Sequence, residues 1–313
     1  MSDTNFDINQ ELSFSLKDIF LVLWSEKKII LGISLPIFLL SIIVSLSIPN
    51  KYISSTTIQI IDDTSNEALS SAINQFGGLS SIGGVAISGT ESKEDLFLEE
   101  VKSREFLRHI LKFNGINESI MASKGFDPIS NKIIFNEKIF DSKKSKWVRS
   151  PPKDRKQVPS YIEVYESAEF NENFSILYDK KTNFITISFK HFSPIFAHDF
   201  VSLVINEMDN IKREKDLLEA ERSLDYLKNM LEETNEKEIK DLISRLIESK
   251  LKIQMLANVN ENYIINVIDE PFVPEKKSEP RRSRIVLIST FIGFLLISFY
   301  VFTFRREHLS LKK

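Results

Sequence analysis

The stretch IILGISLPIFLLSIIVSLSI at residues 29–48 decides the fold together with a second one, IVLISTFIGFLLISFYVFTF, at residues 285–304. Each is 20 residues long, carries no charge and contains 14 residues that are Ile, Leu, Val or Phe. At about 1.5 Å per helical residue, 20 residues span the ~30 Å hydrocarbon core of a bilayer. The sequence therefore predicts two transmembrane helices, one near each end of the chain.

These two stretches divide the chain into five predicted parts. The fold class that they indicate is α+β, with two transmembrane helices flanking an α/β base domain that carries a long extended helix. The parts are an N-terminal segment with an amphipathic helix (1–28), the first helix (29–48), the main domain (49–284), the second helix (285–304) and a tail (305–313). A cleaved signal peptide is the disfavoured alternative for the first helix, because its apolar core is longer than the 7–15 residues typical of signals.

The distribution of basic residues around the two helices bears on their orientation in the membrane. Seven Lys and Arg residues flank the two helices on the side of the termini, and six flank them on the side of the main domain. Lys27 and Lys28 directly precede the first helix, which usually dominates topology. We therefore expect both termini in the cytoplasm and the main domain on the opposite side of the membrane.

The composition excludes several kinds of chemistry. The chain has no cysteine, so it forms neither disulfides nor thiolate metal sites. Its four histidines have no ligand spacing, no Gly-x-Ser-x-Gly motif occurs, and the net charge of -3 does not suggest nucleic-acid binding. We expect no catalytic residue, no metal and no cofactor. A pair of carboxylates that folding brings together stays an open alternative.

Three features lie before or near the start of the main domain. Residues 16–24 (LKDIFLVLW) form an amphipathic stripe, either a helix on the membrane surface or the first turns of the span. Pro36 interrupts the first apolar stretch and is either a packing kink or a tolerated irregularity. The Gly/Ser-rich segment 76–89 lacks the Lys of a phosphate loop, and we interpret it as a flexible or closely packed segment.

The main domain shows both the two-residue alternation of strands and the three- to four-residue spacing of helices. β-favouring or alternating residues predict strands at 51–62, 174–178, 184–189 and 264–268, and helical spacing predicts a helix over 91–113. Segment 143–159 carries seven basic residues, one acid and three prolines. It is either a solvated connector, the favoured interpretation, or a surface that attracts anionic lipid headgroups or polysaccharide.

A helical pattern without Gly or Pro after its first residue runs over about 194–258. A straight helix of this length would reach nearly 100 Å, so it must project from the domain or double back at Asn235. Its narrow apolar stripe needs a partner helix, either within the chain or from further copies. The predicted contacts between copies are the leucines of this stripe, Leu224, Leu227, Leu231, Leu242 and Leu246.

Several of these segments, in this order, resemble the bacterial Wzz-type chain-length determinants, also called polysaccharide co-polymerases. The resemblance rests on residues 16–24, segment 76–89, KSREFL at 102–107, WVR at 147–149, DKKT at 179–182, SP at 193–194, and above all MLANVNENY at 255–263 followed by VIDEP at 267–271 and VPE at 273–275. One departure is Asn260, where an Arg is more usual, which puts any contact between copies at that position in doubt.

The resemblance implies a non-enzymatic protein of the bacterial inner membrane with a periplasmic α/β base. Such proteins form ring-like homo-oligomers and set the modal length of O-antigen or a related glycan, with a Wzy-type polymerase that acts on undecaprenyl-linked polysaccharide. Because the chain ends nine residues after the second span, it resembles the type without a tyrosine kinase domain.

Small residues and a proline in the predicted spans are the candidate contacts within the membrane, since small side chains allow helices to approach closely in lipid. They are Pro36, Ser289, Gly293 and Ser298. Three alternatives to a chain-length regulator stay open: a co-polymerase for capsule or exopolysaccharide export, a double-anchored periplasmic sensor, and a membrane enzyme that acts on lipid-linked sugar.

Overall fold

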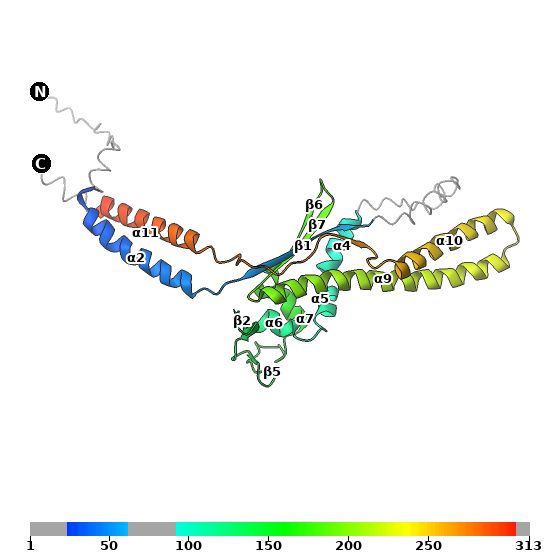
Figure 1. Ribbon diagram of the computed structural model, residues 1–313, viewed down its shortest axis with the longest axis horizontal. Coiled ribbons are helices and arrows are strands. Elements are labelled where there is room, and N and C mark those ends of the chain that lie inside the picture. Colours follow the sequence, from blue (N-terminus) through cyan, green and yellow to red (C-terminus); the bar gives the residue numbers. More distant parts are fainter. Residues whose placement is uncertain (1–23, 62–91, 305–313) are drawn as a thin grey trace, which may run out of the picture. The chain divides into compact units, whose positions relative to one another are not determined.

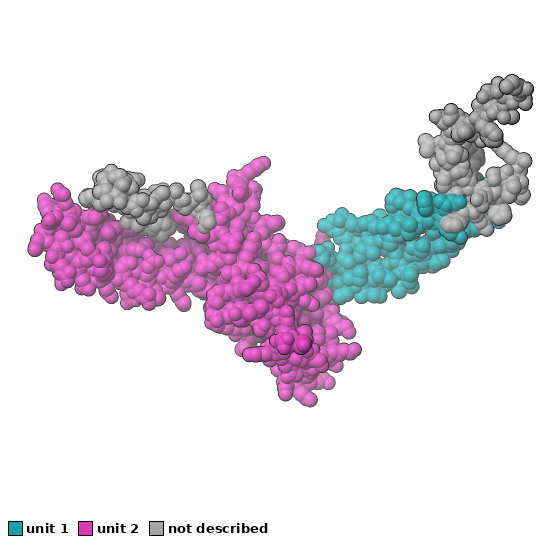
Figure 2. Space-filling view, turned by 180° about the vertical axis from the view of Figure 1, so that it is seen from behind, with its two compact units in different colours: residues 1–50, 278–313 teal, residues 51–277 magenta. Residues whose placement is uncertain are grey.

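The computed structural model describes residues 24–61 and 92–304. The chain divides into two compact units, residues 1–50 with 278–313 and residues 51–277 (Figure 2). The predicted amphipathic helix before the first span, apart from Trp24, lies outside the described residues, as do segment 76–89 and the tail 305–313.

The first unit is a pair of apolar helices, α2 (Lys27–Ser47) and α11 (Arg282–Phe304). Both are long and apolar enough to cross a membrane. They pack against each other through Ile30, Ile297 and Val301. Helix α2 continues through Pro36. The predicted α+β class, with two apolar helices flanking a mixed domain, is confirmed.

The second unit is built on one antiparallel sheet. Its strands lie in the order β6 (Phe174–Asp179), β7 (Phe184–His191), β1 (Tyr52–Ile60) and β8 (Ile265–Asp269). Side chains along β7 are alternately buried and half-buried, as expected for a strand with one face in a core. The register places Ile58 of β1 opposite Ile185 of β7.

Helices cover the buried face of this sheet. The first half of α9 (Pro194–Glu233) packs on β1 and β7 (Figure 1). The remaining helices of the base are short, namely α4 (Lys93–Val101), α5 (Arg104–Ile110), α6 (Ile116–Ala122), α7 (Tyr161–Glu166) and α8 (Ala168–Asn171). Together with the sheet they enclose one apolar core that includes Ile187, Phe189 and Phe200.

The helix that the sequence predicts over 91–113 is two helices. Helix α4 ends at Val101 and α5 begins at Arg104. The hydroxyl of Ser103 accepts a hydrogen bond from the backbone N–H of Phe106 at 3.1 Å and so caps the second helix. A serine at this position favours a new helix start over a continuous helix.

A small lobe follows α6. It contains two hairpins, β2 (Ser123–Asp127) with β3 (Lys132–Phe135), and β4 (Phe140–Asp141) with β5 (Lys146–Trp147). Ala122, Phe140 and Trp147 form a separate apolar cluster beneath them. The segment 143–159, interpreted from the sequence as a connector or a binding surface, therefore begins with part of an ordered hairpin.

The long helical region doubles back. Helix α9 ends at Glu233 and α10 (Lys237–Val259) begins after three intervening residues, Thr234, Asn235 and Glu236. The two helices pack against each other and extend from the base as an arm (Figure 1). Of the two arrangements that the sequence leaves open, the protomer has the hairpin, which supplies α10 as an intramolecular partner.

Candidate functional site: the helical arm and its clasp

Helix α9 is one continuous helix that lies in two different environments. Its first half is buried in the base, through Phe200, Val201, Val204, Ile205 and Met208. In the second half only Ala220 and Leu224 are buried. The second half and α10 therefore form an arm with little core of its own.

The seam of the arm is small. Leu224 is 4% exposed, and Ile243 and Ala257 are the buried residues of α10. An ion pair crosses the arm from Lys250 Nζ to Glu219 Oε1 at 3.1 Å. The other four predicted contact leucines are half-buried, namely Leu227, Leu231, Leu242 and Leu246. The protomer thus uses part of the predicted apolar stripe to hold its own two helices together.

Apolar side chains remain on the outside of the arm. Tyr226 is 65% exposed and Val259 is 76% exposed. Further exposed apolar residues of α9 and α10 are Leu218, Ile239, Leu251 and Met255. An exposed apolar surface of this kind suits contact with another protein surface better than contact with water.

A buried carboxylate fixes the arm where it leaves the base. Asp209 accepts hydrogen bonds from the backbone N–H groups of Tyr263 (3.0 Å), Ile264 (2.8 Å) and Ile265 (3.2 Å). It also accepts from Arg213 Nη2 at 3.0 Å, one turn further along α9. These donors satisfy the charge of Asp209 in place of water.

Arg213 binds the same turn from the other side. Its Nη1 donates to the carbonyl oxygens of Ala257 (3.2 Å) and Asn260 (3.0 Å), and its Nη2 donates to that of Glu261 (2.6 Å). The Ala257 carbonyl belongs to the last turn of α10, where helical partners are lacking, and those of Asn260 and Glu261 follow directly after the helix. We call Asp209, Arg213 and the turn 257–265 the clasp. Asn260 itself contributes its backbone carbonyl to the clasp.

A third residue of α9 completes this contact. The hydroxyl of Tyr263 donates to Asp216 Oδ2 at 3.0 Å, and Lys212 Nζ lies 3.0 Å from Asp216 Oδ1. Asp209, Arg213 and Asp216 are spaced by four and three residues and therefore share one face of the helix. The sequence analysis did not predict that these three residues join α9 to the turn. The only signal for it is that their charges interrupt the apolar pattern of α9.

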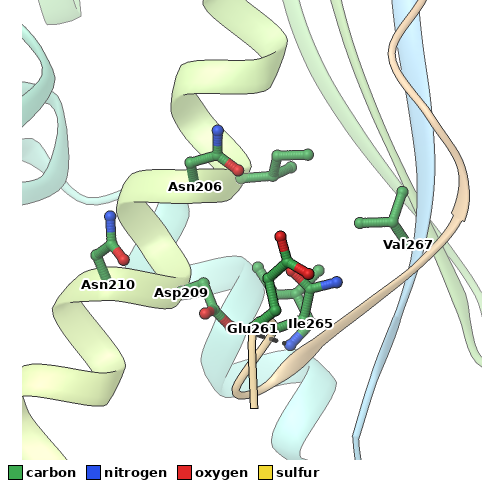
Figure 3. Close-up of a pocket in the computed structure, with 8 residues that line it drawn as sticks. Asn206, Asp209, Asn210, Glu261, Ile265 and Val267 are labelled. Carbon is green, nitrogen blue, oxygen red and sulfur yellow. Dashed lines mark hydrogen bonds between the residues drawn. The ribbon is translucent and has the colours of Figure 1, made fainter. Parts of the chain in front are cut away.

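A shallow pocket lies beside the clasp, between α9 and the start of β8 (Figure 3). Asn206, Asp209 and Asn210 line it from α9, and Glu261 and Asn262 line it from the turn. The Asp209 carboxylate is already occupied by backbone donors and Arg213, so it holds the fold and is not placed to act as a general base.

The three histidines among the described residues serve structural contacts. His109 Nε2 lies 2.6 Å from Glu207 Oε2 and ties α5 to α9, and His198 pairs with the neighbouring Asp199. His191 is buried in the base, where its ring contacts the backbone of Ser119 and Ser193. Within residues 24–61 and 92–304, no group of three His, Cys, Asp or Glu side chains is placed to hold a metal ion.

The predicted membrane contacts lie on α2 and α11. A Cβ added at Gly293 would lie 3.1 Å from the side chain of Ile37 on α2, whereas one added at Gly32 would meet nothing within 4 Å. Gly293 therefore allows a close approach of the two helices. Ser289 donates to the carbonyl of Ile285 at 2.7 Å within its own helix. Ser298 is half-buried and Pro36 is exposed. The structure thus gives Gly293 an intramolecular neighbour and leaves Pro36 on the outer surface.

Residues 12–112 match the family model described as Wzz, chain length determinant protein. This match confirms, over that part of the chain, the resemblance that the sequence predicts. Wzz-family co-polymerases are non-enzymatic, as expected for this chain. No curated protein matches the chain.

Solved structures of two co-polymerases are similar to the chain. A full-length bacterial polysaccharide co-polymerase is 12% identical, with 96% of this chain and 99% of that chain covered and a TM-score of 0.38. A fragment of WzzB, a polysaccharide co-polymerase from Salmonella Typhimurium, is also 12% identical, with coverage of 74% and 100% and a TM-score of 0.31.

Proposed function

We propose that the protein regulates the chain length of a bacterial surface polysaccharide, because residues 12–112 match the family model of the Wzz chain length determinant proteins. The polymer is O-antigen or a related lipopolysaccharide glycan. The protein acts as an oligomeric membrane scaffold beside a Wzy-type polymerase, which elongates the undecaprenyl-linked chain. The observation that carries this proposal is the family match in a chain with two apolar helices.

The proposed location is the inner membrane, with both termini in the cytoplasm and residues 49–284 in the periplasm. The two apolar helices support the membrane anchor, and Lys27 and Lys28 before α2 favour the orientation. Pro36, Ser289, Gly293 and Ser298 are proposed as contacts of the spans with each other or with the polymerase.

Self-association is proposed to occur through the arm. Tyr226, Met255 and Val259 expose apolar surface there, and the arm buries few residues within the protomer. The half-buried leucines at 227, 231, 242 and 246 lie at the edges of the same seam and extend this surface, while Leu224 contributes by holding the hairpin together. A ring of protomers would cover these side chains.

A gel profile of surface glycan, with and without the protein, tests the function. We expect deletion to broaden or shift the length distribution and to leave the sugar repeat and its polymerisation intact. Complete loss of polymer would contradict a regulatory role and favour an enzyme. A change confined to capsule or secreted exopolysaccharide would assign the protein to export of those polymers, and an unchanged profile would favour a sensor.

Cross-linking tests the assembly. The chain has no cysteine, so Val259→Cys and Tyr226→Cys each introduce a single thiol on the arm. We expect a bifunctional thiol reagent to link these variants into dimers in native membranes. Leu177→Cys on edge strand β6, which is 66% exposed, is the matched control away from the arm. Linking at Leu177 but at neither arm position would contradict assembly through the arm.

A further inference from the structure

The lobe formed by residues 123–159 has a charge opposite to that of the rest of the chain. It contains eight Lys, two Arg and four acidic residues, a net charge of +6, whereas the remaining residues sum to -9. We call it the basic lobe. It comprises the β2–β3 and β4–β5 hairpins and the loop that leads to α7 (Figure 1).

The positive charges of the basic lobe face solvent. All eight lysines are exposed, and in the described part of the chain only Lys144 has a carboxylate within 4 Å, that of Asp141 at 3.9 Å. Two of the four acidic side chains already accept hydrogen bonds from the backbone of their own turns: Asp127 accepts from the N–H of Ile129, and Asp141 accepts from that of Lys143. The lysines therefore produce an unbalanced positive field.

The surface that carries these lysines is ordered. Arg149 forms a bidentate ion pair with the buried carboxylate of Glu163 on α7. It also donates from Nε to the carbonyl of Gln157 and from Nη2 to that of Lys156, each at 2.8 Å. The loop is thereby fixed to the base, so Lys153 and Lys156 are presented without a further ordering cost.

A single apolar side chain projects from the tip of the β2–β3 hairpin. Ile129 is 94% exposed, next to Pro128. The Asp127 carboxylate fixes the turn by accepting from Ile129 N–H (3.0 Å) and from the Ser130 hydroxyl (2.7 Å). On β3, Lys132 and Ile134 are both exposed and share one face of the strand. Basic residues beside exposed apolar ones are typical of surfaces that enter a bilayer interface.

A short piece of chain connects the sheet that holds the root of the basic lobe to a proposed membrane helix. Ser123, the first residue of β2, bonds His191 Nε2 at 3.0 Å, and His191 pairs in the sheet with Tyr52. Tyr52 follows Ser47, the last residue of α2, by five residues, which span at most about 18 Å. The chain thus ties the root of the lobe to the end of a helix that can cross a membrane.

We propose that the basic lobe docks on the anionic lipid headgroups of the bilayer that α2 and α11 span, with Ile129 inserted into the interface. This inference rests on the membrane anchoring in the proposed function. The lysines supply attraction to lipid phosphate. Ile129 gains free energy when it enters the bilayer interface, and a soluble anionic polysaccharide offers no comparable apolar contact. The site belongs to the second unit and involves none of the arm residues.

Single-cysteine labelling in the full chain tests this proposal. Ile129→Cys is labelled with an environment-sensitive fluorophore, and the protein is reconstituted in nanodiscs with or without phosphatidylglycerol, each doped with brominated lipid. We expect bromine quenching about threefold stronger in the anionic discs than in neutral ones, and loss of that difference at about 0.5 M salt. A label at Tyr226→Cys on the arm is the unquenched control.

A label at Leu296→Cys, in the exposed face of α11, separates the two proposals. Quenching at Leu296 without quenching at Ile129 overturns the docking and leaves the anchor intact. No quenching at Leu296 overturns the anchor itself. Equal quenching of Ile129 in neutral and anionic discs overturns the role of charge. A response of the Ile129 label to added anionic polysaccharide, with none to lipid, overturns the lipid assignment in favour of glycan.

A matched pair of charge variants tests the lysines. Lys143→Gln with Lys146→Gln and Lys153→Gln removes three exposed charges from the basic lobe. Lys215→Gln with Lys228→Gln and Lys237→Gln removes the same number from the arm. We expect the first set to reduce the anionic quenching of the Ile129 label by at least about twofold and the second to leave it unchanged. Equal effects of both sets would contradict a localised docking surface.

Discussion

The two halves of helix α9 have opposite roles although they belong to one uninterrupted helix. In the base half, Phe200 lies with its ring centroid 4.2 Å from that of Phe189, and both side chains are almost fully buried. In the arm half, the seam consists of Leu224 and Ala220 against α10. Since buried apolar area supplies most folding free energy, the base stabilises the protomer and the arm depends on what covers it.

The clasp marks the boundary between these halves. Asp209 and Arg213 lie at the point where apolar packing on the sheet ends and the arm begins. They join α9 to the turn between α10 and β8 through backbone groups, so the position of the arm follows the position of the base. Four variants or conditions test this division, and their expected effects fall from Phe200→Ala to Glu219→Gln.

Phe200→Ala should have the largest effect, because it removes a buried aromatic side chain from the base core. We expect a loss of about 3–5 kcal/mol of stability, measured by thermal unfolding of the detergent-solubilised chain with circular dichroism. Leu218→Ala, on the exposed side of the arm half, is the control and should change stability little. A small effect of Phe200→Ala would mean that the base is not the stabilising region.

Acidification should weaken the base through His191. Burial is the main reason that the pKa of His191 falls from the usual 6.5 to about 4; nearby Lys51 also lowers this pKa, whereas the hydrogen bonds to the backbone of Ser119 and Ser193 raise it. Its Nε2 faces the carbonyl of Ser119 at 2.9 Å, and its Nδ1 accepts from the N–H of Ser193. The folded base therefore holds a neutral ring, whereas the unfolded chain binds a proton below pH 6.5.

The sign of the pH dependence follows from this difference. Stability from His191 is complete above pH 6.5 and is lost as the pH falls towards 4, by about 3 kcal/mol in total. Urea unfolding at pH 7, 5.5 and 4.5 measures it. His191→Gln should flatten the slope, whereas His198→Gln, at a position that is not buried, should keep it. A slope that survives His191→Gln would assign the dependence to other groups.

Asp209→Asn should loosen the arm from the base at a cost of about 2 kcal/mol, because the amide loses the charge-assisted bonds to three backbone N–H groups and Arg213. Hydrogen exchange should rise at residues 263–265 and in α10, with the sheet between β6 and β7 unchanged. Asp199→Asn, on the base half and exposed, is the matched control. A uniform rise across the base would contradict a local role of the clasp.

Much of the fold could be predicted because periodic signals dominate it. The apolar runs at 29–48 and 285–304 and the alternation at 184–189 depend only on local sequence. The break between α4 and α5 was missed, because a single capping serine, Ser103, decides it within an otherwise helical pattern. Whether the long helical region projects as one helix or folds into a hairpin depends on contacts between residues distant in sequence, and the periodicity of a sequence gives no information about such contacts.

The site was harder to predict for a related reason. The leucine stripe at 224–246 was visible in the sequence, but its division between the intramolecular seam and the outer surface follows from how α9 and α10 pack. The clasp joins Asp209 to residues more than 50 positions away, so no local sequence motif predicts it. Likewise, Arg149 lies in a charged, proline-rich segment whose composition alone favoured a solvated connector.

Glu219→Gln should have the smallest effect and gives the sharpest test of the arm. This change removes the ion pair with Lys250. Because the Glu219 side chain is 65% exposed, we expect the free energy of unfolding to fall by only about 0.2–1 kcal/mol, and by less in added salt. Hydrogen exchange of α10 at several protein concentrations measures it. A larger, salt-insensitive loss that depends on protein concentration would mean that another chain covers this pair. The arm would then draw its stability from its neighbours in an assembly, and the contrast between the two halves of α9 would apply to the isolated protomer alone.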